Sequence, residues 1–218
     1  MMDRTDCQAA SRGFTVVELL VALGLAAVVF GMIVSFFADM SRSTTIQNAA
    51  ASAQQTARAG VDFMAQELRL AGLDPLNSAG AGIEWISPAG IRFTSDSCNV
   101  KIGDSGTCGN PVPDGNVDGK NERVTYLYDA GSRVLRRYLY EGTASQSWMP
   151  LLEQVEPNPG NIPLFTFLDE TGNSITSDTD RGKIRTVLIT LTILEPAGRS
   201  KMVERTYSSR VRLRNIGL

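Results

Sequence analysis

Residues 14–37 read FTVVELLVALGLAAVVFGMIVSFF, a run in which Glu18 is the only charged side chain. A helix of this length extends about 36 Å, which is enough to cross a hydrocarbon core of about 30 Å. The run therefore predicts a membrane-spanning helix. The residues before it include Arg4 and Arg12 and no apolar stretch, so we expect the N-terminal end to stay cytoplasmic and the rest of the chain to face outward.

The position of Gly13 distinguishes this N-terminus from an ordinary secretory signal. In such a signal, a short apolar core precedes a small-residue cleavage site. Here Gly13 comes before the apolar run. A cut after Gly13 would free a polar leader, residues 1–13, and would leave the helix as an anchor.

The segment at 13–20, GFTVVELL, resembles the processing motif of type IV prepilins and secretion pseudopilins. This resemblance implies that a prepilin peptidase cuts between Gly13 and Phe14 and that the new amino group of Phe14 is methylated. It also implies an assembly role for Glu18, which would become the fifth residue of the mature chain.

The physical chemistry of Glu18 supports such a role independently. An ionised carboxylate within a membrane is costly and is rarely left without a partner. The new amino group of Phe14, one helical turn away, could pair with Glu18 of the same chain or of a neighbour. The alternative is that Glu18 lies at the membrane edge and is hydrated or protonated.

Cysteine usage fits the predicted leader. The chain has three cysteines, Cys7, Cys98 and Cys108, and removal of the leader would take Cys7 away. The remaining two could then form a disulfide that closes a small loop in an oxidising compartment. Two unpaired thiols are the alternative.

Composition argues against two large functional classes. The chain contains no histidine, so it lacks the commonest general base near neutral pH and the commonest zinc ligand. We therefore expect no enzyme activity. Its net charge is -2, which gives no reason to expect a nucleic-acid partner.

A second helical pattern continues through residues 38–72, which contain no proline. Its apolar residues recur every three or four positions and define one face of a helix. These residues are Ile46, Ala50, Ala53, Ala57, Val61, Met64, Leu68 and Ala71. Gly72 and Pro75 then supply a stop. We expect one helix over 14–71 whose second part packs on a sheet or a sibling helix, with a coiled coil as the alternative.

Residues 73–218 read as a globular antiparallel β domain, because short alternating runs are separated by Gly, Pro, Asn and Asp. The predicted strands are 90–94, 123–128, 133–140, 164–168, 183–194 and 202–214. In the fifth, four apolar residues from Val187 to Ile193 alternate with Thr190 and Thr192, so one face should be buried against the helix. The segment 129–132 reads as a hairpin turn.

The last predicted strand has a basic outer face. Val203, Tyr207, Val211 and Leu213 alternate with polar residues that end in Arg210, Arg212 and Arg214. A solvated sheet face and a contact with an acidic neighbour are the two interpretations of these arginines.

The loop 114–119, DGNVDG, carries the one candidate metal site. Its oxygen ligands Asp114, Asn116 and Asp118 occupy positions 1, 3 and 5 of an EF-hand-like pattern with Gly at position 6. Position 12 is Thr125 rather than Glu, so Glu122 is the candidate for the missing carboxylate, and any calcium affinity should be weak. The alternative is a polar turn that leads into the strand at 123. No cofactor is otherwise expected.

Three further segments resemble the PilW family of minor pilins: LRLAGLDP at 68–75, RVTYLY at 123–128 and VRLRN at 211–215. The resemblance implies an α+β pilin-like fold, in which a long N-terminal helix, membrane-spanning in its first half, packs on an antiparallel β-sheet. It implies a minor pilin, a structural subunit that primes or supports assembly of the type IV pilus.

The resemblance also implies partners and a location. The partners would be other minor and major pilins, the prepilin peptidase, the inner-membrane assembly platform and the lipid bilayer. The chain would sit in the inner membrane with its C-terminal domain periplasmic, and then in the pilus on the cell surface. A GspJ-type pseudopilin of a type II secretion system is the first alternative, and an adhesive or ligand-binding tip module is the second.

Overall fold

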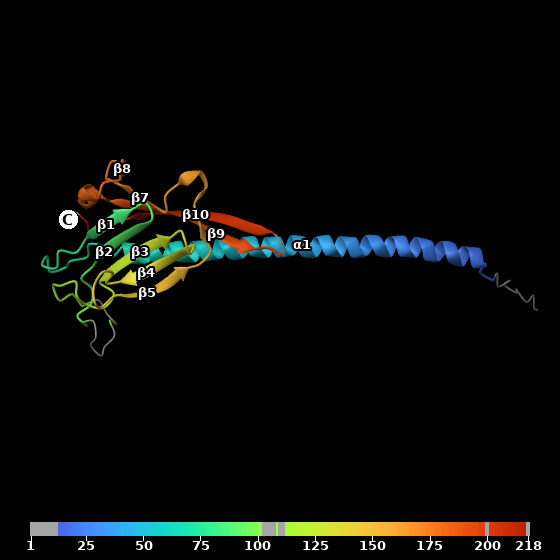
Figure 1. The fold of residues 1–218 in the computed structure, drawn as a ribbon, viewed down its shortest axis with the longest axis horizontal. Coiled ribbons are helices and arrows are strands. Elements are labelled where there is room, and N and C mark those ends of the chain that lie inside the picture. Colours follow the sequence, from blue (N-terminus) through green and yellow to red (C-terminus); the bar gives the residue numbers. More distant parts are fainter. Residues whose placement is uncertain (1–12, 102–107, 109–111, 199–200, 217–218) are drawn as a thin grey trace, which may run out of the picture. The chain divides into compact units, whose positions relative to one another are not determined.

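The computed structural model describes residues 13–101, 108, 112–198 and 201–216 (Figure 1). Within these residues the α-helix α1 runs from Val16 to Leu68. The chain separates into two compact units, Met1–Thr45 and Ile46–Leu218. The first unit therefore holds the N-terminal part of α1, and the second holds the rest of the helix and all strands of the described residues.

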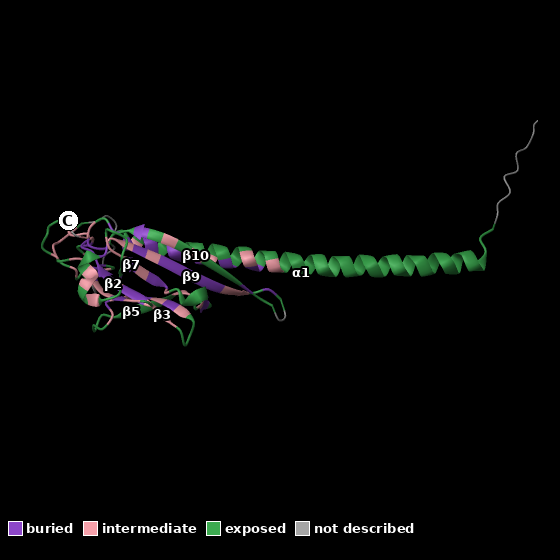
Figure 2. Cartoon of the chain, turned by 90° about the horizontal axis from the view of Figure 1, so that it is seen from above, coloured by how far each residue is buried: buried purple, intermediate pink, exposed green. Residues whose placement is uncertain are grey.

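The described part of the first unit, residues 13–45, is exposed throughout (Figure 2). Large apolar side chains such as Leu25 and Phe30 are more than half exposed. A helix that is apolar on all sides and has no protein cover is typical of a membrane span. The helix is long and apolar enough to cross a membrane, which agrees with the expectation drawn from residues 14–37.

In the second unit, α1 presents one buried face. The buried side chains of this face recur at helical spacing from Ala49 to Leu68 and include Ala53, Ala57, Val61 and Met64. Ile46 and Ala50, two of the predicted stripe residues, are only half-buried. The predicted stripe therefore identifies the packed face, and the small alanines allow close contact with the sheets.

The helix ends at Leu68, three residues before the predicted end. There the backbone switches to tighter turns, in which the N–H groups of Ala71 and Leu73 donate to the carbonyls of Leu68 and Leu70. Gly72 has a φ of +77°, which favours glycine, and a Cβ there would lie 2.9 Å from the Asn215 carbonyl oxygen. The C-terminal segment thus packs against the helix exit.

One sheet is an antiparallel meander in the order β1-β2-β3-β4-β5. Its strands are β1 (Ile83–Ser87), β2 (Gly90–Thr94), β3 (Arg123–Asp129), β4 (Val134–Leu139) and β5 (Ser147–Leu152). The predicted turn at 129–132 joins β3 to β4, where the Asp129 carboxylate accepts hydrogen bonds from the Gly131 N–H and the Ser132 hydroxyl. This hairpin prediction is confirmed.

The second sheet has the order β10-β9-β7-β8, and β6 pairs with β9 as well. Its strands are β6 (Val155–Glu156), β7 (Phe165–Leu168), β8 (Ser174–Ile175), β9 (Thr186–Pro196) and β10 (Met202–Arg212), with short 3-10 turns η1 (Pro159–Asn161) and η2 (Asp178–Lys183) between them. β9 and β10 pair along their whole length, from Thr186 with Arg212 to Pro196 with Met202.

The core lies between α1 and the two sheets. Buried side chains of α1 join those of both sheets in one cluster, to which β9 contributes Val187, Ile189, Leu191 and Ile193. This confirms the predicted buried face of the fifth strand. The opposite face of β9 is also covered, because the Asn158 side chain donates to the Thr190 carbonyl and accepts from the Thr192 hydroxyl.

The strand predictions were incomplete in two respects. Four strands were not predicted: β1, β5, β6 and β8. Of these, β6 and β8 have only two residues each. β5 contains Pro150, which an edge strand tolerates but which obscures the strand pattern. In addition, the predicted strand 183–194 begins only at Thr186. Lys183 belongs to η2, where its amino group pairs with Asp180 at 2.6 Å.

Candidate functional site

The predicted processing site lies at the start of α1. Gly13 and Phe14 precede the helix, have no regular secondary structure and are exposed. The Glu18 backbone N–H donates to the Thr15 hydroxyl oxygen at 3.2 Å, and that hydroxyl lies 3.5 Å from the Glu18 carboxylate. Thr15 therefore acts as the N-cap of α1, since its hydroxyl satisfies the Glu18 N–H, one of the donors that a helix start leaves unpaired.

The capping role of Thr15 was missed from the sequence, although Thr15 and Glu18 carry the spacing that signals it. The cap explains why α1 begins at Val16 rather than at Phe14. It also gives Glu18 a contact within its own chain at an exposed position. Residues 1–12, and with them Cys7, Arg4, Arg12 and most of the predicted leader, lie outside the described residues.

The loop with the candidate calcium ligands is organised around buried carboxylates. Glu122 is fully buried, and its oxygens accept hydrogen bonds from the backbone N–H groups of Ser97, Cys98 and Gly119 at 2.7, 2.8 and 2.7 Å. Asp96, also fully buried, accepts from the N–H groups of the 114–115 turn, both at 3.0 Å. Together these two side chains hold three chain segments in place.

Burial raises the pKa of Glu122, and the nearby Asp96 carboxylate adds to this, although the three backbone donors oppose the shift. Gly119 is required at its position, because a Cβ there would lie 2.1 Å from the Cys98 carbonyl oxygen. The Tyr140 hydroxyl donates to the Gly119 carbonyl. The loop is therefore tightly packed where it meets β3.

The four predicted calcium ligands have different partners in this loop. Asp118 pairs with Lys101 at 3.0 Å, Asp114 accepts from the Asn116 N–H at 3.0 Å, and Glu122 faces backbone donors. Within the described ranges, no group of three or more His, Cys, Asp or Glu side chains is placed to hold a metal ion. Calcium binding stays a prediction from the sequence pattern.

The predicted disulfide is present. Cys98 and Cys108 are bonded, with their Cα atoms 5.5 Å apart, which is an ordinary separation for a disulfide. It closes a loop next to the segment that Glu122 holds, so both covalent and polar contacts fix the same part of the chain.

A buried polar cluster that was not predicted joins α1 to the first sheet. Both Glu67 carboxylate oxygens accept from the Arg137 guanidinium, at 2.7 and 3.0 Å, and the Tyr126 hydroxyl donates to the same carboxylate. The Arg137 side chain is only 6% exposed. The sequence held a signal, because Glu67 lies three residues after Met64 and four before Ala71 and therefore falls on the apolar stripe.

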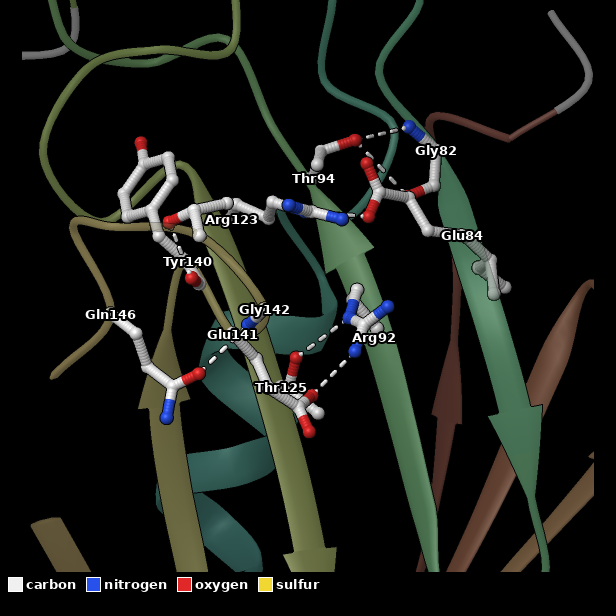
Figure 3. Close-up of polar contacts among 12 residues, drawn as sticks. Gly82, Glu84, Arg92, Thr94, Arg123, Thr125, Tyr140, Glu141, Gly142 and Gln146 are labelled. Atoms are coloured by element: carbon white, nitrogen blue, oxygen red, sulfur yellow. Dashed lines mark hydrogen bonds and ion pairs between the residues drawn. The ribbon is translucent and has the colours of Figure 1, made fainter. Parts of the chain in front are cut away.

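Half-buried ion pairs cross the outer part of the same sheet (Figure 3). Arg123 on β3 pairs with Glu84 on β1 at 2.7 Å, and Arg92 on β2 pairs with Glu141, just beyond β4, at 2.5 Å. The Arg92 Nε also donates to the Thr125 hydroxyl at 3.1 Å. Each ion pair connects strands that are not direct neighbours, so these contacts stabilise the sheet. They also leave Arg92 and Arg123 with carboxylate partners inside the protein.

No family model matches the chain, and comparison with curated proteins and with solved structures finds no match either. A proposal about function therefore has to come from the residues and their geometry.

Glu122→Gln should lower the free energy of unfolding by about 1–3 kcal/mol, because an amide NH2 would replace one acceptor oxygen and face a backbone N–H donor. Urea unfolding of the full chain in nonionic detergent near pH 7 would measure the loss. The matched control is Glu153→Gln, an exposed site, for which a change below about 0.5 kcal/mol is expected. Equal stability of the two variants would contradict the role assigned to Glu122.

Proposed function

We propose that this chain is a type IV pilin-like protein: a membrane-anchored subunit that joins a filament through its N-terminal helix after removal of a short leader. Within that class, we propose a minor pilin of the PilW type, which primes or supports pilus assembly. The observation that carries the proposal is the division of α1 into an exposed apolar part and a part that is packed into the β domain.

The two parts of α1 have distinct roles in this proposal. Residues from Ala49 onward hold the β domain through their buried face. Residues 16–45 contribute no buried side chain, so their apolar surface is free for lipid and, after assembly, for the helices of other subunits. Transfer from bilayer to filament would then need no unfolding of the β domain.

Glu18 would determine the register in which neighbouring subunits pack during assembly. Glu18 is exposed, and among the described residues its carboxylate has one weak contact, with the Thr15 hydroxyl at 3.5 Å. Cleavage after Gly13 would create an ammonium group at Phe14, and pairing between that group and Glu18 of a neighbour would remove two charges from the apolar surroundings together. Such pairing favours subunits packed in one register.

Deletion of the gene tests the proposed function directly. We expect surface filaments to be lost or strongly reduced in sheared-cell preparations and restored by the wild-type gene on a plasmid. Secreted proteins are measured in the same strains. Normal filaments with a loss of secreted proteins would contradict the pilus role and support the secretion pseudopilin.

Glu18→Ala should insert and be processed but should fail to restore filaments, because the terminal ammonium loses its partner. Filament yield from sheared cells, normalised to mature protein on an immunoblot, measures this loss, which we expect to exceed about tenfold. Thr15→Ala is the matched control, since it removes the cap contact but keeps the carboxylate. A normal filament yield for Glu18→Ala, or an equal loss for both variants, would contradict the pairing.

A further inference from the structure

A shallow polar hollow of about 390 Å³ lies beside the C-terminal end of β10. Arg210 and Arg212 line it from β10, and Arg185 lines it from the position before β9. The turn 169–172 after β7 lines it as well. None of the lining residues belongs to α1 or to the candidate processing and calcium sites. The hollow is therefore a separate feature of the β domain.

The β pairing explains why the arginines gather there. Arg210 pairs across with Leu188, and Arg212 pairs with Thr186, while Val211 between them is buried in the core. Residues two apart on a strand point to the same face, so the two arginine side chains start about 7 Å from each other on the outer face of the sheet. Arg185 directly precedes β9 and adds a third guanidinium.

These arginines differ from those of the first sheet in what they contact. Across the described residues, the Arg210 and Arg212 side chains make no ion pair or hydrogen bond, and both are exposed. Arg185 donates to two backbone carbonyls, those of Gly182 and Ile184, both at 2.9 Å. By contrast, Arg92, Arg123 and Arg137 each have a carboxylate partner.

The acidic residues of the hollow do not pair with these arginines. Asp169 accepts from Thr171 and Asn173 of its own turn, at distances between 2.8 and 3.3 Å. These bonds, from Thr171 first, hold the pKa of Asp169 below its usual value. Glu170 is exposed at the rim. The three guanidiniums exceed the two carboxylates by one positive charge.

We propose that this hollow binds a carboxylate of an acidic segment in a partner protein. Arginine forks match a carboxylate in a bidentate manner, and one such group would balance the excess charge of the hollow. A polyanion fits less well, since Glu170 on the rim and Glu204 further along β10 would repel it, and no aromatic side chain lines the hollow for base stacking. The inference concerns the β domain alone and does not depend on the filament role.

Fluorescence anisotropy on the full chain in nonionic detergent tests the proposal. The probe is a labelled, end-capped peptide with adjacent Asp and Glu flanked by Gly and Ser. Its controls are the same peptide with Asn and Gln, and a labelled oligothymidylate. We expect binding of the acidic peptide that weakens as salt is raised, with no binding of the amide peptide and weaker binding of the oligonucleotide.

Two variants should move the affinity in opposite directions. R210Q/R212Q should weaken peptide binding roughly tenfold or more, and R205Q, an arginine of the same strand outside the hollow, should leave it unchanged. E170Q should strengthen binding about two- to threefold, because a like charge leaves the rim. Melting temperatures of all variants show whether they fold.

The inference would be overturned by an absence of acidic-peptide binding at millimolar concentration, or by equal losses in R205Q and R210Q/R212Q. Tighter binding of the oligonucleotide than of the peptide would also overturn it, in favour of a polyanion site. Because none of these measurements involves filaments, they are independent of the deletion experiment.

Discussion

A Gly13→Glu chain is expected to remain at its precursor size, with less than about a tenth converted to the mature form. A Cβ at Gly13 would meet no atom within 4 Å, so the substitution leaves the helix start undisturbed. Any loss of processing would then reflect recognition by the proposed prepilin peptidase, since Glu would replace the smallest residue next to the proposed cleavage point. An immunoblot against a C-terminal tag measures the ratio of the two forms.

Gly24→Ala is the matched control for this prediction. Gly24 lies in the apolar run, and a Cβ there also meets no atom within 4 Å, so this variant should be processed normally. Mass spectrometry of the mature wild-type chain should find an N-terminal Phe14 with one added methyl group. Mature-size Gly13→Glu protein in wild-type amounts would contradict cleavage after Gly13.

Glu67→Ala should lower the free energy of unfolding by about 3 kcal/mol or more, because it leaves the buried Arg137 guanidinium without a countercharge. The Tyr126 hydroxyl would lose its acceptor in the same variant. Urea unfolding of the full chain in nonionic detergent, followed by tryptophan fluorescence, measures the change.

Two further variants separate this cluster from an ordinary surface pair. Asp62→Ala removes an exposed ion pair with Arg58 on the same helix and should cost less than about 1 kcal/mol. Glu67→Leu combined with Arg137→Met replaces the charges by apolar groups and should restore much of the loss. A double variant as unstable as Glu67→Ala would mean that the cluster acts through more than its charge.

The helix and the longest strands could be predicted from the sequence because their signals are local. The apolar run at 14–37, the stripe from Ala53 to Leu68, and the alternation in β9 each depend only on side-chain spacing. β1 could not be predicted in this way, since a register shift between Ile83 and Trp85 breaks its alternation, and β5 shows no buried residue that would mark a core-facing side. Pro150 further hides β5.

The candidate sites show the same difference between local signals, which the sequence reveals, and contacts that form only in the folded chain. The spacing of Cys98 and Cys108 was enough to predict their disulfide once Cys7 was assigned to the leader. The roles of Glu122 and Asp96 were not predictable, because their partners are backbone N–H groups that only the folded loop brings together. The Glu67–Arg137 contact joins residues 70 positions apart, and a local sequence pattern cannot predict a contact between residues so far apart in the chain.

The N-cap at Thr15 bears on the order of events in the proposed processing of the chain. The residues that fix the first turn of α1, Thr15 and Glu18, both lie on the C-terminal side of the Gly13–Phe14 bond. Precursor and mature chain would thus have the same helix start under the proposed cleavage, and this start would form before the leader is removed. The proposed cleavage would then change the charges at that end of the helix and leave its first turn unchanged.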